Sequence, residues 1–289
     1  IGCHAMVAFM EPERTGDLVG LTCMGSEGAQ WIGRAPFTNV PHMIQNIGDG
    51  TYFHSGSLVP RFAVASGANI TFRILYNGVI AMTGGQMPAG QQTIPDLCQS
   101  LLGEGVKQVA VVTDEIDRYT TSVRRDLPPG VIVHDRSQLE KVEVEFAKVL
   151  GVTAIIYDQA CSNELRRLRK REVVPDRKKR IVINEAVCEG CGDCGVKSTC
   201  LSVQPVESLL GRKTQIHQGS CNTDYSCLDG DCPSFVTVEA DRVPSRTVVV
   251  GDIRLPVIGP PREIAQVPAD GFGVYTVGVG GTGLVTLNQ

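Results

Sequence analysis

The cysteines of this chain are distributed very unevenly. Seven of its eleven cysteines lie between Cys188 and Cys232. The other four are scattered at Cys3, Cys23, Cys98 and Cys161. Secreted disulfide scaffolds are cysteine-dense short chains, whereas here a long cysteine-poor region precedes the cluster, which favours reduced thiols and a metal in a reducing cytoplasm. We therefore expect a small metal-supported module beside a larger module with an ordinary core.

Length and charge exclude several other classes. The 289 residues allow one large domain or two ordinary ones, and two is the better expectation. A net charge of -4 gives no global reason to expect nucleic acid as a partner. No apolar run approaches the length of about 20 residues that a membrane helix needs, and Ile1-Gly2-Cys3-His4 opens no leader, so no membrane partner is expected. The opening without methionine indicates a piece of a longer polypeptide.

The region from about Leu18 to Tyr157 predicts an α/β fold, because short apolar stretches alternate with glycines and polar helical segments, as in parallel sheets with crossover helices. The expected strands are His42–Ile47, Ile70–Tyr76, Gln108–Thr113 and Thr153–Tyr157. A helix is expected over Ser137–Val149, where apolar residues fall on one face.

Composition changes further along the chain mark the domain limits. A basic stretch, Asn163–Arg180, ends the first domain at about residue 175; such runs are usually solvated, but this one could dock an acidic electron-transfer partner. The expected parts are a domain over 1–175, a cysteine domain over 181–240, a proline-rich linker over 241–270 and the truncated start of a further α/β module over 271–289. The glycines at 278, 280 and 283 have dinucleotide-binding spacing, but too few residues follow them for that site.

An anion and metal site is predicted at Gly48-Asp49-Gly50. Asp49 directly follows an expected strand, and ligand crevices lie at the carboxyl ends of parallel strands. The glycines let backbone amides approach an anion, and a helix expected near Ser55 adds its positive end. Asn77 ends the next strand after a spacer of twenty-six residues, so Asp49, Asn77 and the carbonyl of Val79 could hold a divalent ion on a diphosphate. The alternative is an ordinary turn, which often uses glycine and aspartate.

The clustered cysteines predict iron–sulfur clusters. Cys188, Cys191 and Cys194 are each three apart, and a distant Cys232-Pro233 fits the fourth ligand of a bacterial [4Fe–4S] pattern. The second set is Cys200, Cys221 and Cys227, with Asp224 where a cysteine would stand. We expect two clusters, the second ligated by Asp224 or present as a three-iron [3Fe–4S] cluster. A zinc site is the alternative, and the spacing fits zinc poorly.

Several of these motifs occur together in one family. Gly-Asp-Gly followed by Asn77 resembles the thiamine diphosphate enzymes, although Gly78 stands where many members have a second asparagine. Met-Thr-Gly-Gly-Gln at 82–86, together with segments 2–4 and 24–31 and the cysteine region, resembles the 2-oxoacid:ferredoxin oxidoreductases, most of all their indolepyruvate-type members. This resemblance covers nearly the whole chain.

The resemblance implies roles for particular residues. Magnesium would be held by Asp49, Asn77 and Val79, and residues 1–175 would form the thiamine diphosphate-binding domain, 181–240 a ferredoxin-like domain and 271–289 the start of a gamma-type module. The cofactor would contact Cys3, His4, Gly25, Ser26, Glu27, Gly48, Asp49, Gly50, Thr51, Asn77 and Thr83. Alternatively, Cys3 and Cys23 are small core residues. Trp31 is expected in the core rather than in a substrate wall.

The resemblance also implies a reaction. A 2-oxoacid, with an arylpyruvate such as indolepyruvate favoured, would lose carbon dioxide and give an acyl-coenzyme A, while electrons pass singly through the clusters to ferredoxin. The full-length protein would be a dimer, and its other domains or subunits would supply an activating carboxylate, so this chain alone is expected to be inactive. The rival interpretations are a non-oxidative thiamine diphosphate decarboxylase or synthase, and an electron-carrier subunit without catalysis.

Overall fold

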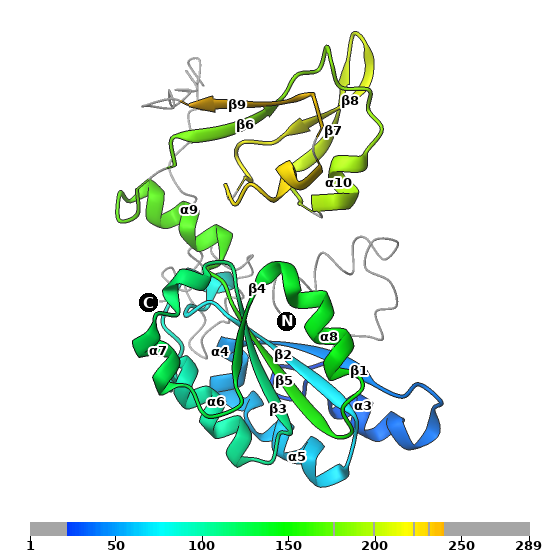
Figure 1. Cartoon of the computed structure of the whole chain (residues 1–289), viewed down its shortest axis with the longest axis vertical. Helices are drawn as coiled ribbons and strands as arrows, with labels where there is room; N and C mark the ends of the chain where they lie inside the picture. Colours follow the sequence, from blue (N-terminus) through cyan, green and yellow to red (C-terminus); the bar gives the residue numbers. More distant parts are fainter. Residues whose placement is uncertain (1–21, 176, 199, 222, 231, 240–289) are drawn as a thin grey trace, which may run out of the picture. The chain divides into compact units, whose positions relative to one another are not determined.

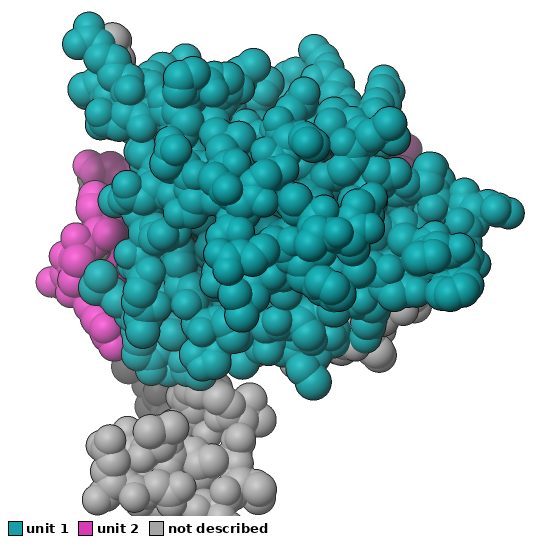
Figure 2. Space-filling model, turned by 90° about the horizontal axis from the view of Figure 1, so that it is seen from below, with its two compact units in different colours: residues 1–164, 278–289 teal, residues 165–277 magenta. Residues whose placement is uncertain are grey.

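The computed structural model describes residues 22–239 other than 176, 199, 222 and 231. The predicted site residues Cys3 and His4 lie outside the described residues, as do the predicted linker over 241–270 and the module over 271–289. The chain divides into two compact units, unit 1 (Ile1–Glu164 with Gly278–Gln289) and unit 2 (Leu165–Val277), which Figure 2 colours separately. This division assigns most of the basic segment to unit 2, whereas the sequence placed it at the end of the first domain. The domain limits drawn from composition stay predictions.

A five-stranded sheet forms the centre of unit 1, and every pairing in it is parallel (Figure 1). Its strands are β1 (Met43–Gly48), β2 (Ile70–Tyr76), β3 (Gln108–Thr113), β4 (Ile132–Asp135) and β5 (Val152–Asp158), in the spatial order β1-β2-β5-β3-β4. The predicted α/β class is confirmed, and the four expected strands are present with ends shifted by at most one residue. The sequence did not predict β4, because it is short and begins with the exposed Ile132.

Helices cover both faces of this sheet (Figure 1). They are α3 (Ala29–Arg34), α4 (Asp49–Thr51), a π-helical segment (Tyr52–Gly56), α5 (Leu58–Ser66), α6 (Ile94–Gly103), α7 (Thr121–Asp126) and α8 (Leu139–Phe146). Short 3-10 turns occupy Ala35–Phe37, Ala81–Thr83, Ile116–Arg118 and Arg136–Gln138. The helix expected over Ser137–Val149 is therefore shorter, and a 3-10 turn precedes it.

The two faces of the sheet carry separate cores, because successive strand residues point to opposite faces. On one face, Val142 and Phe146 of α8 pack with Ala110, Val112 and Ile155. The opposite face buries alternate strand residues with α3, α5 and α6, including Phe72, Ile74, Val111, Leu97 and the predicted core residue Trp31. Right-handed crossovers explain the split, since only the connection from β4 to β5 runs back along the sheet and so crosses the other face.

Unit 2 is a smaller assembly of two antiparallel pairs. Its elements are α9 (Ser162–Lys170, whose first turn lies in unit 1), β6 (Lys179–Ile183), α10 (Asp193–Ser198), β7 (Val203–Ser208), β8 (Gly211–Ile216), a 3-10 turn (Ser226–Gly230) and β9 (Phe235–Glu239). Strand β6 pairs with β9, and β7 forms a hairpin with β8. Its core is small and includes two cysteines of the cluster, Cys188 and Cys227. A unit with so few apolar residues is of the kind that metal binding stabilises.

No helix within the described ranges is long and apolar enough to cross a membrane.

Candidate functional site

Asp49 lies at the corner where β1 ends and helical backbone begins. Its side chain is almost fully buried, at 2% exposed. One carboxylate oxygen, Oδ1, accepts the Gly50 N–H at 2.7 Å. The other, Oδ2, accepts the N–H groups of Asn77 and Gly78 at 2.9 and 2.7 Å, across to the end of β2. The predicted pair Asp49 and Asn77 is therefore brought together at adjacent strand ends.

The Asn77 turn is shaped by this carboxylate and by its own side chain. Oδ1 of Asn77 accepts the N–H of Val79 at 3.0 Å, and Gly78 has a φ of 75°, a left-handed conformation that suits glycine. Burial raises the pKa of Asp49, and the bonds from the Asn77, Gly78 and Gly50 N–H groups oppose that shift. Because burial disfavours the ionised form of a carboxylate, a nearby cation would stabilise that form.

The donor chemistry of this corner fits a hard divalent ion. Carboxylate, side-chain amide and backbone carbonyl oxygens are ligands that magnesium accepts beside phosphate oxygens. A Cβ placed on Gly48 would meet no atom within 4 Å, so the backbone there faces open space in which an anionic group can approach it. Asp49, Asn77 and Val79 thus carry oxygen atoms of the types that suit a magnesium diphosphate.

Helical backbone starts at Asp49 itself, with Gly48 as the residue before it. The sequence placed this start near Ser55, which is wrong by about two turns because the segment Asp49–Gly56 has only two adjacent aromatic residues, too few to show a helical period. Residues Tyr52–Gly56 form a π-helical stretch before α5 continues the helix. Such π segments often accompany functional sites.

The segment before α3 packs against the same helix. Gly25 has a φ of 93°, and a Cβ there would lie 2.4 Å from Oγ of Ser55, so only glycine allows this approach. Glu27 is 5% exposed and accepts the Gly25 N–H at 2.8 Å. The Ser26 hydroxyl donates to the carbonyl of Cys23 at 2.9 Å. Gly25 therefore packs against the helical segment that follows Asp49, and Ser26 and Glu27 are held in the same turn by local hydrogen bonds. Cys23 is exposed, so the alternative that made it a core residue is wrong.

The Met-Thr-Gly-Gly-Gln stretch forms a closed turn beside this corner. Ile80 and Gln86 form a β-bridge, and the Thr83 hydroxyl donates to the Gln86 amide oxygen at 2.8 Å. Gly50 faces this turn, because a Cβ on Gly50 would lie 3.3 Å from Cγ1 of Ile80. The Thr83 N–H donates to the carbonyl of Ile80 at 3.3 Å, so Thr83 belongs to the turn that Gly50 faces, and its role in cofactor binding stays a prediction.

Glu164 is a residue that the sequence did not single out. It is 9% exposed, and a Cβ on Gly85 would lie 2.2 Å from its Oε2, so its carboxylate lies directly against the Gly84-Gly85 backbone. The signal available in the sequence was an acidic residue opening an otherwise basic helix. Tertiary packing was needed to place it near Thr83, because the two are eighty-one residues apart.

Three members of the first cysteine set, Cys188, Cys191 and Cys194, are electrostatic neighbours beside α10. Cys188 and Cys194 are each 8% exposed, and the Gly190 N–H points to the sulfur of Cys188 at 3.4 Å. Burial raises the pKa of Cys194, and the neighbouring sulfurs of Cys188 and Cys191 raise it further. The hydroxyl of Ser234 lies 3.1 Å from the sulfur of Cys232.

The second set gathers around the loop that ends in the Ser226–Gly230 turn. Burial raises the pKa of Cys227 to about 11, with further contributions from Cys200, Cys221 and Asp224. Burial likewise raises the pKa of Cys221, the charges of Cys200 and Asp224 add to it, and Arg180 opposes it. The four predicted members of the second set are therefore electrostatic neighbours.

Within the described ranges, no three His, Cys, Asp or Glu side chains converge closely enough to hold one metal ion. The magnesium site predicted here uses one carboxylate, one amide and one carbonyl, so it does not depend on such a triplet. An iron–sulfur cubane places its cysteines on separate irons, which leaves the thiolates farther apart than ligands sharing a single ion. Cluster loading itself stays a prediction.

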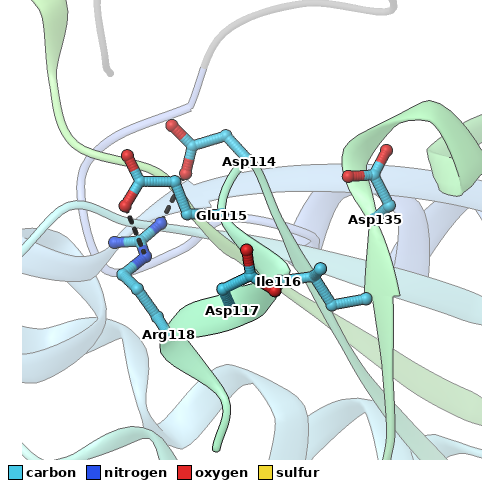
Figure 3. Close-up of a pocket in the computed structure, with 6 residues that line it drawn as sticks. All are labelled: Asp114, Glu115, Ile116, Asp117, Arg118 and Asp135. Carbon is cyan, nitrogen blue, oxygen red and sulfur yellow. Dashed lines mark hydrogen bonds and ion pairs between the residues drawn. The ribbon is translucent and has the colours of Figure 1, made fainter.

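A separate cavity of about 500 Å³ opens at the other end of the strand order, beyond β3 and β4 (Figure 3). Asp114, Glu115, Asp117 and Arg118 follow β3, and Asp135 ends β4. Arg118 pairs with Asp114 and with Glu115, as the dashed lines in Figure 3 show. Burial raises the pKa of Asp114, and Arg118 opposes that shift. Four carboxylates and one guanidinium line this cavity, so its charge is net negative, and no predicted cofactor residue lies in its wall.

The part of the chain that contains Asp49 is similar to a known protein family. The family described as "Thiamine pyrophosphate enzyme, C-terminal TPP binding domain" matches residues 1–125, which include β1, β2 and the Asp49 corner. This part of the chain is therefore similar to the thiamine diphosphate-binding domains of that family.

One known protein is similar to part of this chain. Indolepyruvate oxidoreductase subunit IorA of Pyrococcus horikoshii is 26% identical over 156 residues, covering 53% of this chain and 21% of the relative, so the chain spans about a fifth of that protein. A solved 2-oxoglutarate:ferredoxin oxidoreductase from Magnetococcus marinus is 16% identical, with 48% of this chain and 46% of that chain covered and a TM-score of 0.35. The family and the relative together support membership of the 2-oxoacid:ferredoxin oxidoreductase family, as the sequence motifs predicted.

Proposed function

We propose that this chain contributes the diphosphate half of a thiamine diphosphate site and an electron path to an enzyme that oxidatively decarboxylates a 2-oxoacid. The products would be an acyl-coenzyme A and carbon dioxide, with ferredoxin as the final electron acceptor. An arylpyruvate such as indolepyruvate is the favoured substrate, in keeping with the named relative. Other domains or subunits of the same enzyme would complete the site.

The observation that carries this proposal is the burial of Asp49 between the ends of β1 and β2. Its carboxylate accepts the N–H groups of Asn77 and Gly78, and the Asn77 amide oxygen accepts the N–H of Val79, which supports Asp49, Asn77 and Val79 as the magnesium ligands. Gly48, Gly50 and Thr51 would line the diphosphate, with Thr83 across from them. Thiamine diphosphate, when bound, supplies the carbanion chemistry that removes carbon dioxide from a 2-oxoacid.

The cysteine unit supports the oxidative form of this reaction. Cys188, Cys191, Cys194 and Cys232 would hold the first cluster. The second would be held by Cys200, Cys221 and Cys227, with Asp224 as a fourth ligand or an open position. Iron–sulfur clusters accept electrons one at a time, which suits a two-electron oxidation carried out in two steps.

Binding of thiamine diphosphate tests the first part of the proposal. Isothermal titration calorimetry on the 289-residue chain with magnesium should detect a complex, and Asp49→Ala should weaken it at least tenfold because a ligand charge is removed. Asp117→Ala is the control, since Asp117 is an exposed carboxylate of unit 1 outside the Asp49 corner. Equal affinity in both variants would exclude Asp49 as a ligand.

Iron content tests the second part. Under anaerobic reconstitution we expect about seven or eight irons per chain, as two clusters require. Asp224→Cys should convert the second cluster to a stable four-iron form with an altered electron paramagnetic resonance spectrum. Four irons per chain and no effect of this substitution would contradict two clusters.

The rival interpretations make different predictions. A non-oxidative decarboxylase or synthase would bind thiamine diphosphate through Asp49 but has no use for the clustered cysteines. An electron-carrier subunit would load iron, and Asp49→Ala would change nothing. The two assays above separate these cases.

A further inference from the structure

A basic pocket lies beside the second cysteine set, within unit 2. Its cavity measures about 240 Å³, and the described side chains that line it include four cations and no carboxylate. The lining residues are Arg166, Arg169, Lys170, Arg180, Gln218 and Cys221. The chain as a whole is acidic, with a net charge of -4, so this local concentration of positive charge is not a consequence of composition.

The walls of the pocket are fixed by hydrogen bonds to backbone. Arg166 donates from Nη1 to the carbonyl of Gly219 at 2.9 Å, which ties α9 to the turn before Cys221. Gln218 donates to the carbonyl of Ile181 at 2.6 Å, which ties the same turn to β6. Helix α9 and strand β6 therefore present their cations to one place. Because the geometry is preformed, little ordering is needed before a partner binds.

Positive charge continues from the pocket along the loop after Cys221. The Arg177 guanidinium lies 5.5 Å and the Lys179 ammonium 5.2 Å from the centre of the Tyr225 ring. Arg177 also donates to the carbonyl of Thr223. Together with the four basic residues of the pocket, six cations thus lie beside the loop that carries Cys221, Asp224 and Cys227.

We propose that this basic surface docks an acidic one-electron carrier protein, and that electrons leave the chain there from the second cluster. The inference rests on the proposed function, since it needs a cluster at Cys221. Three observations favour a protein as the occupant: the surface extends past the pocket to Tyr225, the cavity is smaller than most small-molecule sites, and a cluster ligand forms part of its wall. Complementary charge steers such a partner and raises its association rate.

The electron transfer balances without any bond being formed or broken. A reduced second cluster, held by Cys200, Cys221 and Cys227 when bound, would lose one electron, and the oxidised iron–sulfur centre of the carrier would gain it. The positive surface holds the acidic carrier against Cys221 while this happens. A second encounter removes the second electron of the oxidation.

Stopped-flow mixing tests the proposal with the full chain. The chain is reconstituted anaerobically, reduced, and mixed with an oxidised, acidic [2Fe–2S] ferredoxin at about 20 mM and about 500 mM salt. Arg169→Gln with Lys170→Gln removes two pocket charges. Lys141→Gln with Lys148→Gln removes two charges on or beside α8 and is the matched control.

At low salt the pocket variant should reduce ferredoxin about tenfold more slowly than the unmodified chain, because steering of charged partners contributes factors of this order. The control should react at the unmodified rate. At high salt the three proteins should converge, since screening removes the effect of exposed charge. Circular dichroism checks that the variants fold. Lys170→Gln alone, at an exposed position, should lower the rate of ferredoxin reduction at low salt by a smaller factor, and high salt should again remove the difference.

Several results would overturn the docking surface. One is an unchanged rate in the pocket variant, and another is an equal loss in the control. A third is weaker coenzyme A binding with an unchanged ferredoxin rate, which would assign the pocket to a small anion. If the chain takes up no iron, the binding of ferredoxin can still be measured by calorimetry. Salt-sensitive binding that is lost in the pocket variant would then support the docking surface, although the proposed function would fail.

Discussion

Removing the Asp49 carboxylate should destabilise unit 1, and alanine at this position should cost more stability than asparagine. In Asp49→Ala, the Asn77 and Gly78 N–H groups lose their acceptor, and a buried donor left unpaired costs about 1–3 kcal/mol. Relief of the buried charge offsets part of this loss, because burial raises the pKa of Asp49. We expect a net loss of about 2–4 kcal/mol in the free energy of unfolding.

Asp49→Asn separates hydrogen bonding from charge. Its amide oxygen can still accept from Asn77 and Gly78, but its NH₂ group would face the Gly50 N–H, which now bonds to Oδ1. The expected loss is about 1–2 kcal/mol, smaller than for alanine, since only one bond is lost.

Trp31 provides the assay. It is the only tryptophan in the chain, it lies in unit 1 and it is 4% exposed, so its fluorescence in a urea titration reports this unit alone. Asp117→Ala is the control and should change the stability by less than about 0.5 kcal/mol. A loss below about 1 kcal/mol for Asp49→Ala, or an equal loss for asparagine and alanine, would refute the view that this carboxylate organises the turn after β2.

Two further predictions use the same unit. Gly28→Ala should cost about 2–4 kcal/mol, because Gly28 has a φ of 92° and the new Cβ would lie 3.0 Å from the Phe72 ring, whereas Gly33→Ala in α3 meets no atom within 4 Å and should stabilise by about 0.5–1 kcal/mol. Equal effects in the Trp31 urea titration would contradict this. Burial raises the pKa of Cys98 to about 12, so its alkylation at pH 8 should be far slower than that of the exposed Cys23, rising about tenfold per pH unit towards pH 12. Peptide mapping by mass spectrometry measures both sites, and similar rates at pH 8 would contradict the burial of Cys98.

Much of the fold could be predicted because its signals are local. The apolar runs of β2 and β3 were placed to the residue, and β1 and β5 to within one residue, since buried parallel strands are continuous apolar stretches bounded by turns. Strand β4 was missed because it lies at the edge of the sheet and begins with an exposed isoleucine. The spatial order was not predictable either, since β5 follows β4 in the chain but lies between β2 and β3, and no local pattern records that placement.

Residue types at fixed spacings, such as Gly48-Asp49-Gly50 with Asn77, were enough to indicate a kind of chemistry. Tertiary structure decided which of these residues meet. It placed the Asp49 carboxylate on the Asn77 and Gly78 N–H groups, set Glu164 against Gly85 and gathered the cations of α9 and β6 beside Cys221. Spacing records only local backbone geometry, whereas contacts between distant segments depend on how crossovers and packed faces bring strand ends together.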